Sequence, residues 1–340
     1  MEYRSLDRTG VQVSPLCLGA MMFGAWGNHD HRDSVRIIHR ALDAGINFID
    51  TADVYSRGES EEIVAKALSD GRRDDVVLAT KFHGVMGDDP NHQGNSRRWI
   101  VRAVEDSLRR LKTDYIDLYQ VHRPEEDTDV EDTLSALTDL IRAGKVRYAG
   151  SSTFPASQIV EAQWVARERG LERFKCEQPP YSMLVRGIEA DVLPTIERHG
   201  MGAIVWSPLA GGWLAGGYRK GTELPSSTRA DRIPRRYDMS LPENQRKLDA
   251  ADALGRLADE AGIPLVQLAI AWAIHHPAVT SAIIGPRTME HLESQLPAAG
   301  LELDDELLDR IDEIVPPGVN YNHADSGYAN PALEPQARRR

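Results

Sequence analysis

The feature that most constrains the fold of this chain is an alternation of short apolar runs and helical patterns that repeats eight times. The apolar runs occupy residues 16–19, 47–50, 76–80, 116–121, 146–151, 174–178, 202–206 and 281–284. The helical patterns that follow occupy residues 33–44, 59–68, 97–111, 130–143, 155–169, 187–199, 244–261 together with 264–275, and 289–297. Because parallel neighbouring strands need a crossover connection, this alternation predicts a parallel sheet. Eight such units in about 300 residues favour a closed (β/α)8 TIM barrel over an open sheet.

The chain length agrees better with one barrel than with two domains. At about 150 residues per domain, 340 residues would make two domains, whereas an α/β barrel uses about 250 residues as one. We therefore predict a single barrel domain over residues 1–316 and an irregular C-terminal tail over residues 317–340, which is rich in Gly, Pro and Asn. Residues 3–6 and 11–13 flank the turn sequence DRTG and predict an N-terminal β-hairpin at the bottom of the barrel.

The charge balance and the cysteine count exclude several classes of protein. Asp and Glu outnumber Lys and Arg by 52 to 40, a net charge of −12 that argues against nucleic-acid or anionic-membrane partners. No run reaches the roughly 18 apolar residues of a membrane-spanning helix, and the first residues lack the apolar core of a signal peptide. Cys17 and Cys176 are too few for a disulfide scaffold, and neither has the spacing of a metal site. We expect a soluble, cytoplasmic protein without a metal; its oligomeric state stays open.

Polar side chains stand at the ends of three consecutive predicted strands. Asp50 ends the second strand, Lys81 follows the third, His122 follows the fourth, and Tyr55 lies in the loop after the second. In a (β/α)8 barrel the catalytic residues lie at the carboxyl ends of the strands and in the loops that follow them. One such residue alone is most often a loop-facing polar group, but four at adjacent strand ends indicate a site. Charged side chains are rarely buried unless paired, so we expect an ion pair between Lys81 and Asp50.

These four residue types together favour proton transfer to an oxygen atom. A tyrosine is a weak acid at neutral pH, and an ammonium held beside it by a carboxylate stabilises its phenolate and makes it a better proton donor. His122 can orient a carbonyl oxygen or assist the transfer. Such a site suits an oxygen that gains negative charge as hydride reaches carbon, and because no side chain supplies hydride, a cofactor is required. A lyase that forms a Schiff base through Lys81 is an alternative chemistry for this fold.

The motifs that carry these residues resemble the aldo-keto reductase family, over residues 3 to 297. The matching segments are NFIDTADVY (47–55), LATK (78–81) and DLYQVHRP (117–124), and GKVRYAG (144–150) is also typical of that family. The resemblance implies that Tyr55 is the general acid, that Lys81 and Asp50 adjust its acidity, and that His122 positions the carbonyl. It implies reversible NADPH-dependent reduction of a small aldehyde or ketone to the alcohol.

The cofactor assignment depends on the resemblance, because the chain contains neither a GxGxxG fingerprint nor a phosphate-binding P-loop motif. In this family NADP(H) lies extended across the top of the barrel. The residues implied to contact it are Asp50, Ser152 and Gln178 near the nicotinamide, Trp206 stacked on that ring, Ser207, Leu209 and Gly211 near the pyrophosphate, and Gly285, Arg287, His291 and Gln295 near the adenosine, with Arg229 assisting. Arg287 resembles the contact to the adenosine 2′-phosphate, which favours NADP over NAD. A helix N-terminus at 285–295 would favour phosphate as well.

A binding role is the main alternative to catalysis. The segment WSPLA (206–210) resembles the cofactor loop of potassium-channel β-subunits, so a cofactor-binding regulatory subunit with little turnover has to be considered. The four catalytic residue types are all present and the chain adds little beyond the barrel. Both observations favour the enzyme.

Overall fold

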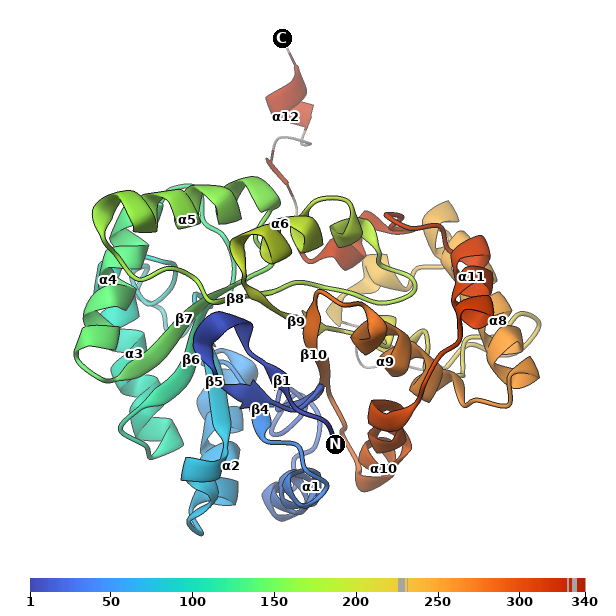
Figure 1. Ribbon diagram of the computed structural model, residues 1–340, viewed down its shortest axis with the longest axis horizontal. Coiled ribbons are helices and arrows are strands. Elements are labelled where there is room, and N and C mark those ends of the chain that lie inside the picture. The colour runs from blue at the N-terminus through green and yellow to red at the C-terminus, as the bar shows by residue number, and fades with distance from the viewer. Residues whose placement is uncertain (226–229, 231, 329, 332–334, 340) are drawn as a thin grey trace.

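In the part of the chain that the structure describes, eight parallel strands close into a barrel, which confirms the predicted fold (Figure 1). This computed structural model describes residues 1–340 apart from 226–229, 231, 329, 332–334 and 340. The barrel strands are β3 (Leu16–Gly19), β4 (Phe48–Asp50), β5 (Val77–Phe82), β6 (Ile116–Val121), β7 (Val146–Ser152), β8 (Cys176–Gln178), β9 (Gly202–Trp206) and β10 (Val279–Ile284). Each pairs in parallel with its neighbours in chain order, and β10 closes the ring on β3.

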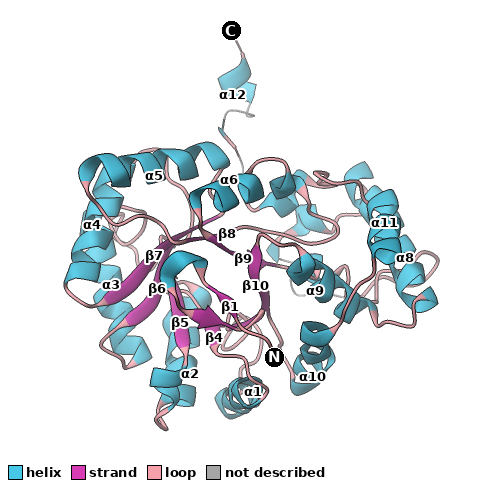
Figure 2. Ribbon diagram, viewed as in Figure 1, coloured by secondary structure: helices cyan, strands magenta, loops and turns pink. Residues whose placement is uncertain are grey.

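Helices surround the barrel on its outside (Figure 2). They are α1 (His31–Asp43), α2 (Glu59–Leu68), α3 (Arg97–Leu111), α4 (Val130–Arg142), α5 (Ala156–Arg169), α6 (Val192–His199), α8 (Pro242–Glu260), α9 (Leu265–His275), α10 (Met289–Gln295) and α11 (Asp305–Ile314). Side chains cap several of them where the sequence places Asp or Ser; Asp30, for example, accepts hydrogen bonds from two amides of α1. The single helix predicted over residues 187–199 is wrong, because a 3-10 turn, Gly187–Glu189, and a break at Asp191 precede α6. Helix α11 was not predicted.

Buried apolar side chains form two clusters among the described residues. The larger cluster lies between the sheet and the helices, and the smaller one fills the inside of the barrel. The inner cluster includes Leu6 and Val13 from the predicted hairpin, whose strands are β1 (Arg4–Ser5) and β2 (Gln12–Val13). Both side chains are fully buried, so the hairpin closes the bottom of the barrel and leaves the top as the open end.

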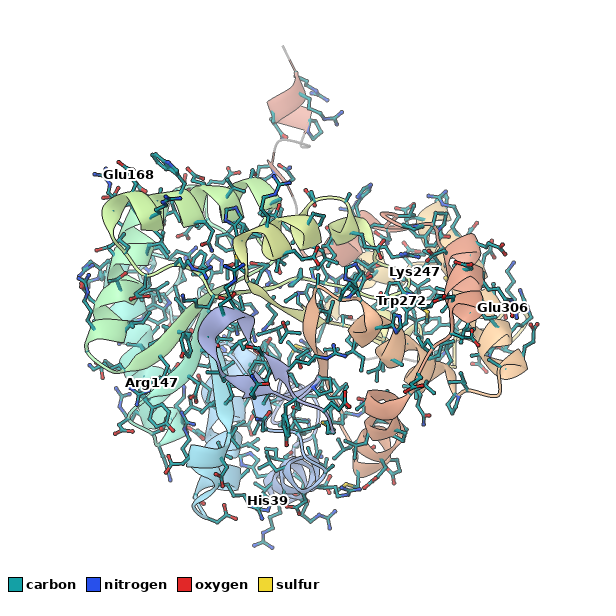
Figure 3. All side chains as sticks on the ribbon, in the orientation of Figure 1. His39, Arg147, Glu168, Lys247, Trp272 and Glu306 are labelled. Carbon is teal, nitrogen blue, oxygen red and sulfur yellow. The ribbon has the colours of Figure 1, made fainter. Side chains whose placement is uncertain are left out.

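In its described residues, the C-terminal tail contains two short elements, a 3-10 turn at His323–Ser326 and helix α12 (Pro335–Arg338), and α12 extends away from the barrel (Figure 1). Its first part is tied to α8 by buried polar contacts. The fully buried Lys247 on α8 donates to Asp325 Oδ2 at 2.7 Å, and Asn322 donates to Asn244 Oδ1 at 2.8 Å (Figure 3). The tail thus lies against the barrel up to about Gly327.

Among the described residues, no single helix is both long enough and apolar enough to cross a bilayer. Helices α8 and α9 taken together have the length and the apolar composition of a membrane span, but the two helices are bent by 99° relative to each other.

Candidate active site

A buried ion pair between Asp50 and Lys81 forms the centre of the site, as expected from the strand ends. Lys81 Nζ donates to Asp50 Oδ2 at 2.5 Å and to the Thr51 carbonyl at 2.8 Å, and neither charged side chain is more than 3% exposed. Burial alone opposes a charged ammonium. The attraction of Asp50 and of Tyr55 outweighs burial and raises the pKa of Lys81, so this side chain stays protonated.

Two buried glutamines hold the second oxygen of Asp50. Gln178 Nε2 donates to Asp50 Oδ1 at 2.8 Å and to Gln120 Oε1 at 3.1 Å, and Gln120 Nε2 donates to Asp50 Oδ1 at 3.1 Å. Gln178 was expected near the cofactor, whereas Gln120 was missed. The alternation of β6 could have revealed it, because Gln120 lies two residues after Leu118, whose side chain points into the barrel.

Tyr55 stands directly beside this pair. Its hydroxyl accepts a hydrogen bond from Lys81 Nζ at 3.3 Å, and the same nitrogen lies 5.0 Å from the ring centroid. The next two residues, Ser56 and Arg57, have φ of 49° and 55°, a left-handed turn that non-glycine residues adopt rarely. Ser56 Oγ accepts from the amide of Trp26 at 3.1 Å, and the Trp26 ring lies 5.9 Å from that of Tyr55. The turn therefore fixes Tyr55 between Lys81 and a second aromatic wall.

His122 is the fourth member of the site. Its backbone amide donates to the Phe82 carbonyl at 3.0 Å, and its ring meets that of Tyr55 edge-on, with centroids 5.7 Å apart and planes at 80°. Burial, together with the positive charges of Arg123 and Lys81, lowers the pKa of His122 well below its usual value. The imidazole is therefore neutral at pH 7, and it can direct a hydrogen bond at a carbonyl oxygen but is not a cationic acid.

These contacts form one connected chain, from the Asp50 carboxylate through the Lys81 ammonium to the Tyr55 hydroxyl. Tyr55 is half-buried, unlike the ion pair behind it. A hydroxyl in this position can hand a proton to a bound oxygen while the ammonium stabilises the phenolate that remains.

Comparison with known proteins agrees with this geometry. The model of the aldo/keto reductase family matches residues 15–316. The chain belongs to the aldo-keto reductase family. An uncharacterised oxidoreductase of Bacillus subtilis, YrpG, is 39% identical over 93% of this chain and 96% of its own length. Aldo-keto reductase YhdN of the same organism is 34% identical over 90% of this chain and 91% of its own length. A probable voltage-gated potassium channel subunit beta of Oryza sativa is 37% identical over 93% of this chain and 97% of its own length. This membership supports an oxidoreductase, and the family uses a nicotinamide cofactor.

The residues expected around the nicotinamide of this aldo-keto reductase lie close together. Ser152 pairs with Gln178 in the β7–β8 register, and its hydroxyl donates to the Gln178 carbonyl at 3.0 Å. The amide of Trp206 donates to the Pro179 carbonyl at 3.0 Å, which places its ring at the same end of the barrel. Trp206 Nε1 is enclosed without a hydrogen-bond acceptor in the described part of the chain. Both amide hydrogens of Gln178 are used within the protein, so its Oε1 is the atom left for a ligand.

The loop after β9 has the backbone shape of an anion site. Ser207, Ala210 and Gly211 have φ of 62°, 49° and 71°, and Leu209, directly before Ala210, has φ −90°. Successive right- and left-handed residues turn neighbouring N–H groups to one side, which favours an anion. At Gly211 a Cβ would lie 2.5 Å from the Tyr237 hydroxyl, so this position requires glycine. Two of these amides already donate within the loop, that of Ala210 to the Ser207 carbonyl at 2.8 Å and that of Gly211 to Ser207 Oγ at 2.9 Å.

The predicted adenosine end differs from the expected helix N-terminus. Helix α10 begins only at Met289 and is capped by the Thr288 side chain, so Gly285 and Arg287 lie in the loop before it. Arg287 is exposed, and its carbonyl accepts from Asn28 Nδ2 at 3.1 Å. Burial and the positive charge of Arg287 lower the pKa of His291.

The residues present fit a dinucleotide, by a test within the structure. Gln295 is 5% exposed, and its Oε1 has no donor among the described residues. A buried acceptor without a partner is costly, and the amino group of an adenine would satisfy it. Trp206 Nε1, a donor without an acceptor among the described residues, is a second unsatisfied buried atom, at the opposite end of the expected cofactor. Arg229 falls within residues 226–229 and lies outside the described part of the chain.

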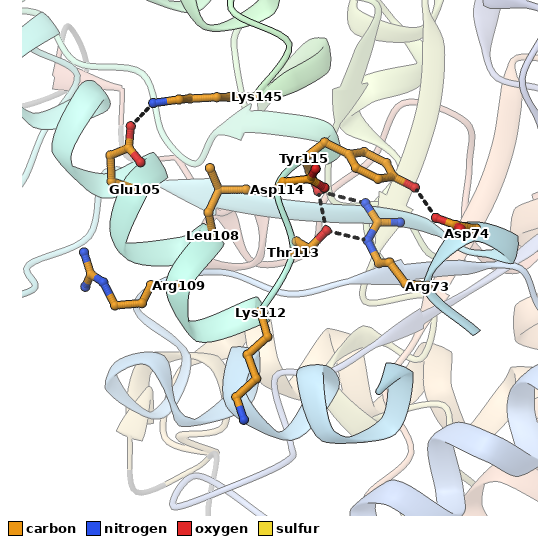
Figure 4. Close-up of a pocket in the computed structure, with 10 residues that line it drawn as sticks. All are labelled: Arg73, Asp74, Glu105, Leu108, Arg109, Lys112, Thr113, Asp114, Tyr115 and Lys145. Atoms are coloured by element: carbon orange, nitrogen blue, oxygen red, sulfur yellow. Dashed lines mark hydrogen bonds and ion pairs between the residues drawn. The ribbon is translucent and has the colours of Figure 1, made fainter. Parts of the chain in front are cut away.

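A surface hollow of about 740 Å³ lies elsewhere, at the carboxyl end of α3 and the start of β6 (Figure 4). Its charged side chains are largely paired: Lys145 contacts Glu105, and Arg73 donates to the Tyr115 carbonyl at 2.8 Å and to Asp117 at 2.9 Å. Its wall contains none of the four residues expected for catalysis.

Proposed function

We propose that this protein is an NADPH-dependent reductase that converts an aldehyde or a ketone to the alcohol and also catalyses the reverse reaction. The observation that carries the proposal is the hydrogen-bonded chain from Asp50 through Lys81 to the hydroxyl of Tyr55. The chain ends in a proton donor that a substrate can reach, and it is backed by an ammonium whose charge is held in place. Family membership supports the reaction class.

Each member of the chain has a separate task in this proposal. Tyr55 gives its proton to the carbonyl oxygen, and Lys81 stabilises the phenolate that results. Asp50, held by Gln120 and Gln178, keeps Lys81 charged and oriented. His122, neutral and edge-on to Tyr55, holds the carbonyl oxygen in line with the proton. NADPH, when bound, supplies the hydride.

The proposed preference for NADP over NAD depends on Arg287. An exposed guanidinium in the loop before α10 can pair with a 2′-phosphate, which NAD lacks. Replacing Arg287 with Ala should raise the KM for NADPH about tenfold or more and leave the KM for NADH nearly unchanged. Arg167→Ala, on the exposed face of α5, is the matched control. Equal increases for both cofactors would contradict the role of Arg287.

The test of the function itself is a panel of aldehydes and ketones, with NADPH oxidation followed by absorbance. Turnover of at least one carbonyl compound, lost in Tyr55→Phe, is the expected result. Binding of NADPH without turnover of any aldehyde or ketone in the panel would favour the regulatory-subunit alternative. The similarity to potassium channel beta subunits is the reason to test that alternative. The assembled site argues against that alternative. Reduction by borohydride of a substrate trapped on Lys81 would instead indicate Schiff-base chemistry.

A further inference from the structure

Arg123 follows the site residue His122 and reaches over the barrel mouth. Its guanidinium carbon lies 6.0 Å from the centroid of the Trp206 ring. Its Nη1 donates to the His122 carbonyl at 2.5 Å and to Thr153 Oγ1 at 3.2 Å. The ring of its neighbour His122 meets that of Tyr55, with centroids 5.7 Å apart. Arg123 is thus next in the chain to a residue that contacts the proposed proton donor, and its guanidinium lies near the indole expected under the nicotinamide.

Most of the hydrogen-bonding capacity of Arg123 is unused. A guanidinium carries five N–H donors, yet both of these contacts use the same nitrogen, and both acceptors are neutral oxygens. Among the described residues, Nε and Nη2 of Arg123 have no acceptor, and no carboxylate lies within 4.0 Å of the guanidinium. Neither nitrogen is sealed inside the protein, since the side chain is half-buried and both atoms remain accessible. One edge of the planar fork is therefore open toward the mouth.

The surroundings do not supply the missing negative charge. The carboxyl of Glu177 acts on the pKa of Arg123, but its oxygens accept from Ser151 Oγ at 2.5 Å and from the Phe154 amide at 3.0 Å. Burial raises the pKa of Glu177 to about 7, so at neutral pH it carries only part of a charge. Charged groups are seldom left buried without a counter-ion, and burial here lowers the pKa of Arg123 itself.

A second guanidinium strengthens the positive field. Arg236 lies 5.9 Å from the same Trp206 ring, and its charge also acts on Arg123. Arg236 Nε donates to the Ala324 carbonyl at 2.8 Å and is 3.6 Å from Asp325, but Asp325 pairs more closely with Lys247, at 2.7 Å. The Asp325 carboxylate is thus shared by Lys247 and Arg236, and no carboxylate in the described part of the chain pairs with Arg123.

We propose that Arg123, supported by Arg236, forms an anion-binding subsite for a carboxylate carried by the carbonyl substrate itself. This proposal rests on the proposed function and names its substrate class, an aldehyde or ketone that bears a carboxylate group. A planar fork with free Nε and Nη2 matches a carboxylate through two parallel hydrogen bonds.

The experiment compares 2-, 3- and 4-carboxybenzaldehyde with benzaldehyde in the holoenzyme, because the three isomers place the carboxylate at different distances from the carbonyl. We expect at least one isomer to exceed benzaldehyde in kcat/KM about tenfold or more. The measured quantity is the ratio of kcat/KM for the carboxybenzaldehyde to kcat/KM for benzaldehyde. The substitution Arg123→Gln should lower this ratio about tenfold or more, and Arg123→Lys, which keeps the charge but loses the planar fork, should lower it less. Arg167→Gln on α5 is the control and should leave the ratio unchanged.

Two results would overturn the proposal. One is a ratio at or below unity for all three isomers; the other is a ratio that Arg123→Gln leaves unchanged. A rise in the KM for NADPH in Arg123→Gln with an unchanged ratio would assign the arginine to a cofactor phosphate instead and would also overturn it.

A binding measurement keeps the proposal testable if no aldehyde is reduced. Benzoate titrated calorimetrically into the NADP⁺ complex should bind the wild type about tenfold more tightly than Arg123→Gln, with circular dichroism to verify that the variant is folded. Equal benzoate affinities overturn the subsite. Absence of turnover together with unequal benzoate affinities overturns the proposed function and supports the subsite.

Discussion

The hollow beside α3 and the mouth of the barrel are both lined by charged side chains, but they differ in how those charges are balanced. In the hollow, Lys145 contacts Glu105, and Arg73 donates to Asp117 and to three further oxygen atoms, two of which belong to Thr113 and Tyr115 (Figure 4). At the mouth, Arg123 has no carboxylate within ion-pair distance among the described residues, and Trp206 Nε1 has no acceptor there. A charged lining does not distinguish the two regions, whereas unsatisfied hydrogen-bonding groups select the mouth.

The largest effect that tests this contrast is expected at Tyr55. Tyr55→Phe removes the proton donor but keeps the ring that packs against Trp26, so kcat for carbonyl reduction should fall by about a hundredfold to ten-thousandfold. Steady-state kinetics measure the loss, and calorimetric titration with NADPH should show that binding is retained. If turnover continued near the wild-type rate, the mouth would not be the catalytic centre in the way described.

Lys81→Met should be the most destabilising change at the mouth. It leaves the buried carboxylate of Asp50 without its counter-ion, so the free energy of unfolding should fall by about 3–5 kcal/mol, as urea denaturation would measure. The double variant Asp50→Asn/Lys81→Met should recover part of this loss because it removes the stranded charge. A loss below about 1 kcal/mol in Lys81→Met would mean that the pair is not sealed from water.

Glu177 offers a test by pH. Burial raises the pKa of this carboxyl from 4.5 to about 7 in the folded protein. The protonated form is thus favoured by folding, and its contribution to stability is full below pH 4.5 and is lost as the pH rises through about 7. Relative to Glu177→Gln, the wild type should lose about 3 kcal/mol between pH 4.5 and pH 8, as measured by denaturation at each pH. Parallel curves for the two proteins would show that Glu177 titrates normally.

The smallest effect is expected in the hollow. Lys145→Ala breaks an ion pair between two half-exposed side chains, so the free energy of unfolding should change by less than about 1 kcal/mol. Carbonyl reduction should keep its wild-type kcat/KM. A marked loss of activity in Lys145→Ala would give the hollow a role in function and would remove the contrast with the mouth.

The sequence was a good guide wherever local pattern and barrel topology act together. Asp50, Lys81 and His122 were predicted to meet because the carboxyl ends of parallel strands meet at one end of a barrel, and they do. The direction of a side chain beyond its strand was harder to predict. Arg123 was part of a recognised motif, but its reach toward Thr153 depends on a residue 30 positions later in the chain.

Contacts between distant segments and irregular backbone account for the other differences. The helix expected over residues 187–199 is broken at Asp191 by its non-helical backbone, although an Asp directly before a helix is a common start signal. The tail was expected to be irregular, yet part of it is fixed by the pair between Lys247 and Asp325, which are 78 positions apart. Neither residue shows by itself that the other will neutralise it.

The ion pair between Lys247 and Asp325 also affects folding during synthesis and the choice of a C-terminal boundary. At Gly327, two residues beyond Asp325, a Cβ would lie 2.6 Å from the Trp206 side chain, so the tail backbone packs closely against the indole. The four residues proposed for catalysis are synthesised early, but Lys247 stays without its counter-ion Asp325 until nearly the whole chain has been made. A shortened version that ends where the family match ends, at residue 316, would strand an ammonium in the interior. The boundary for any truncated protein therefore lies after Gly327.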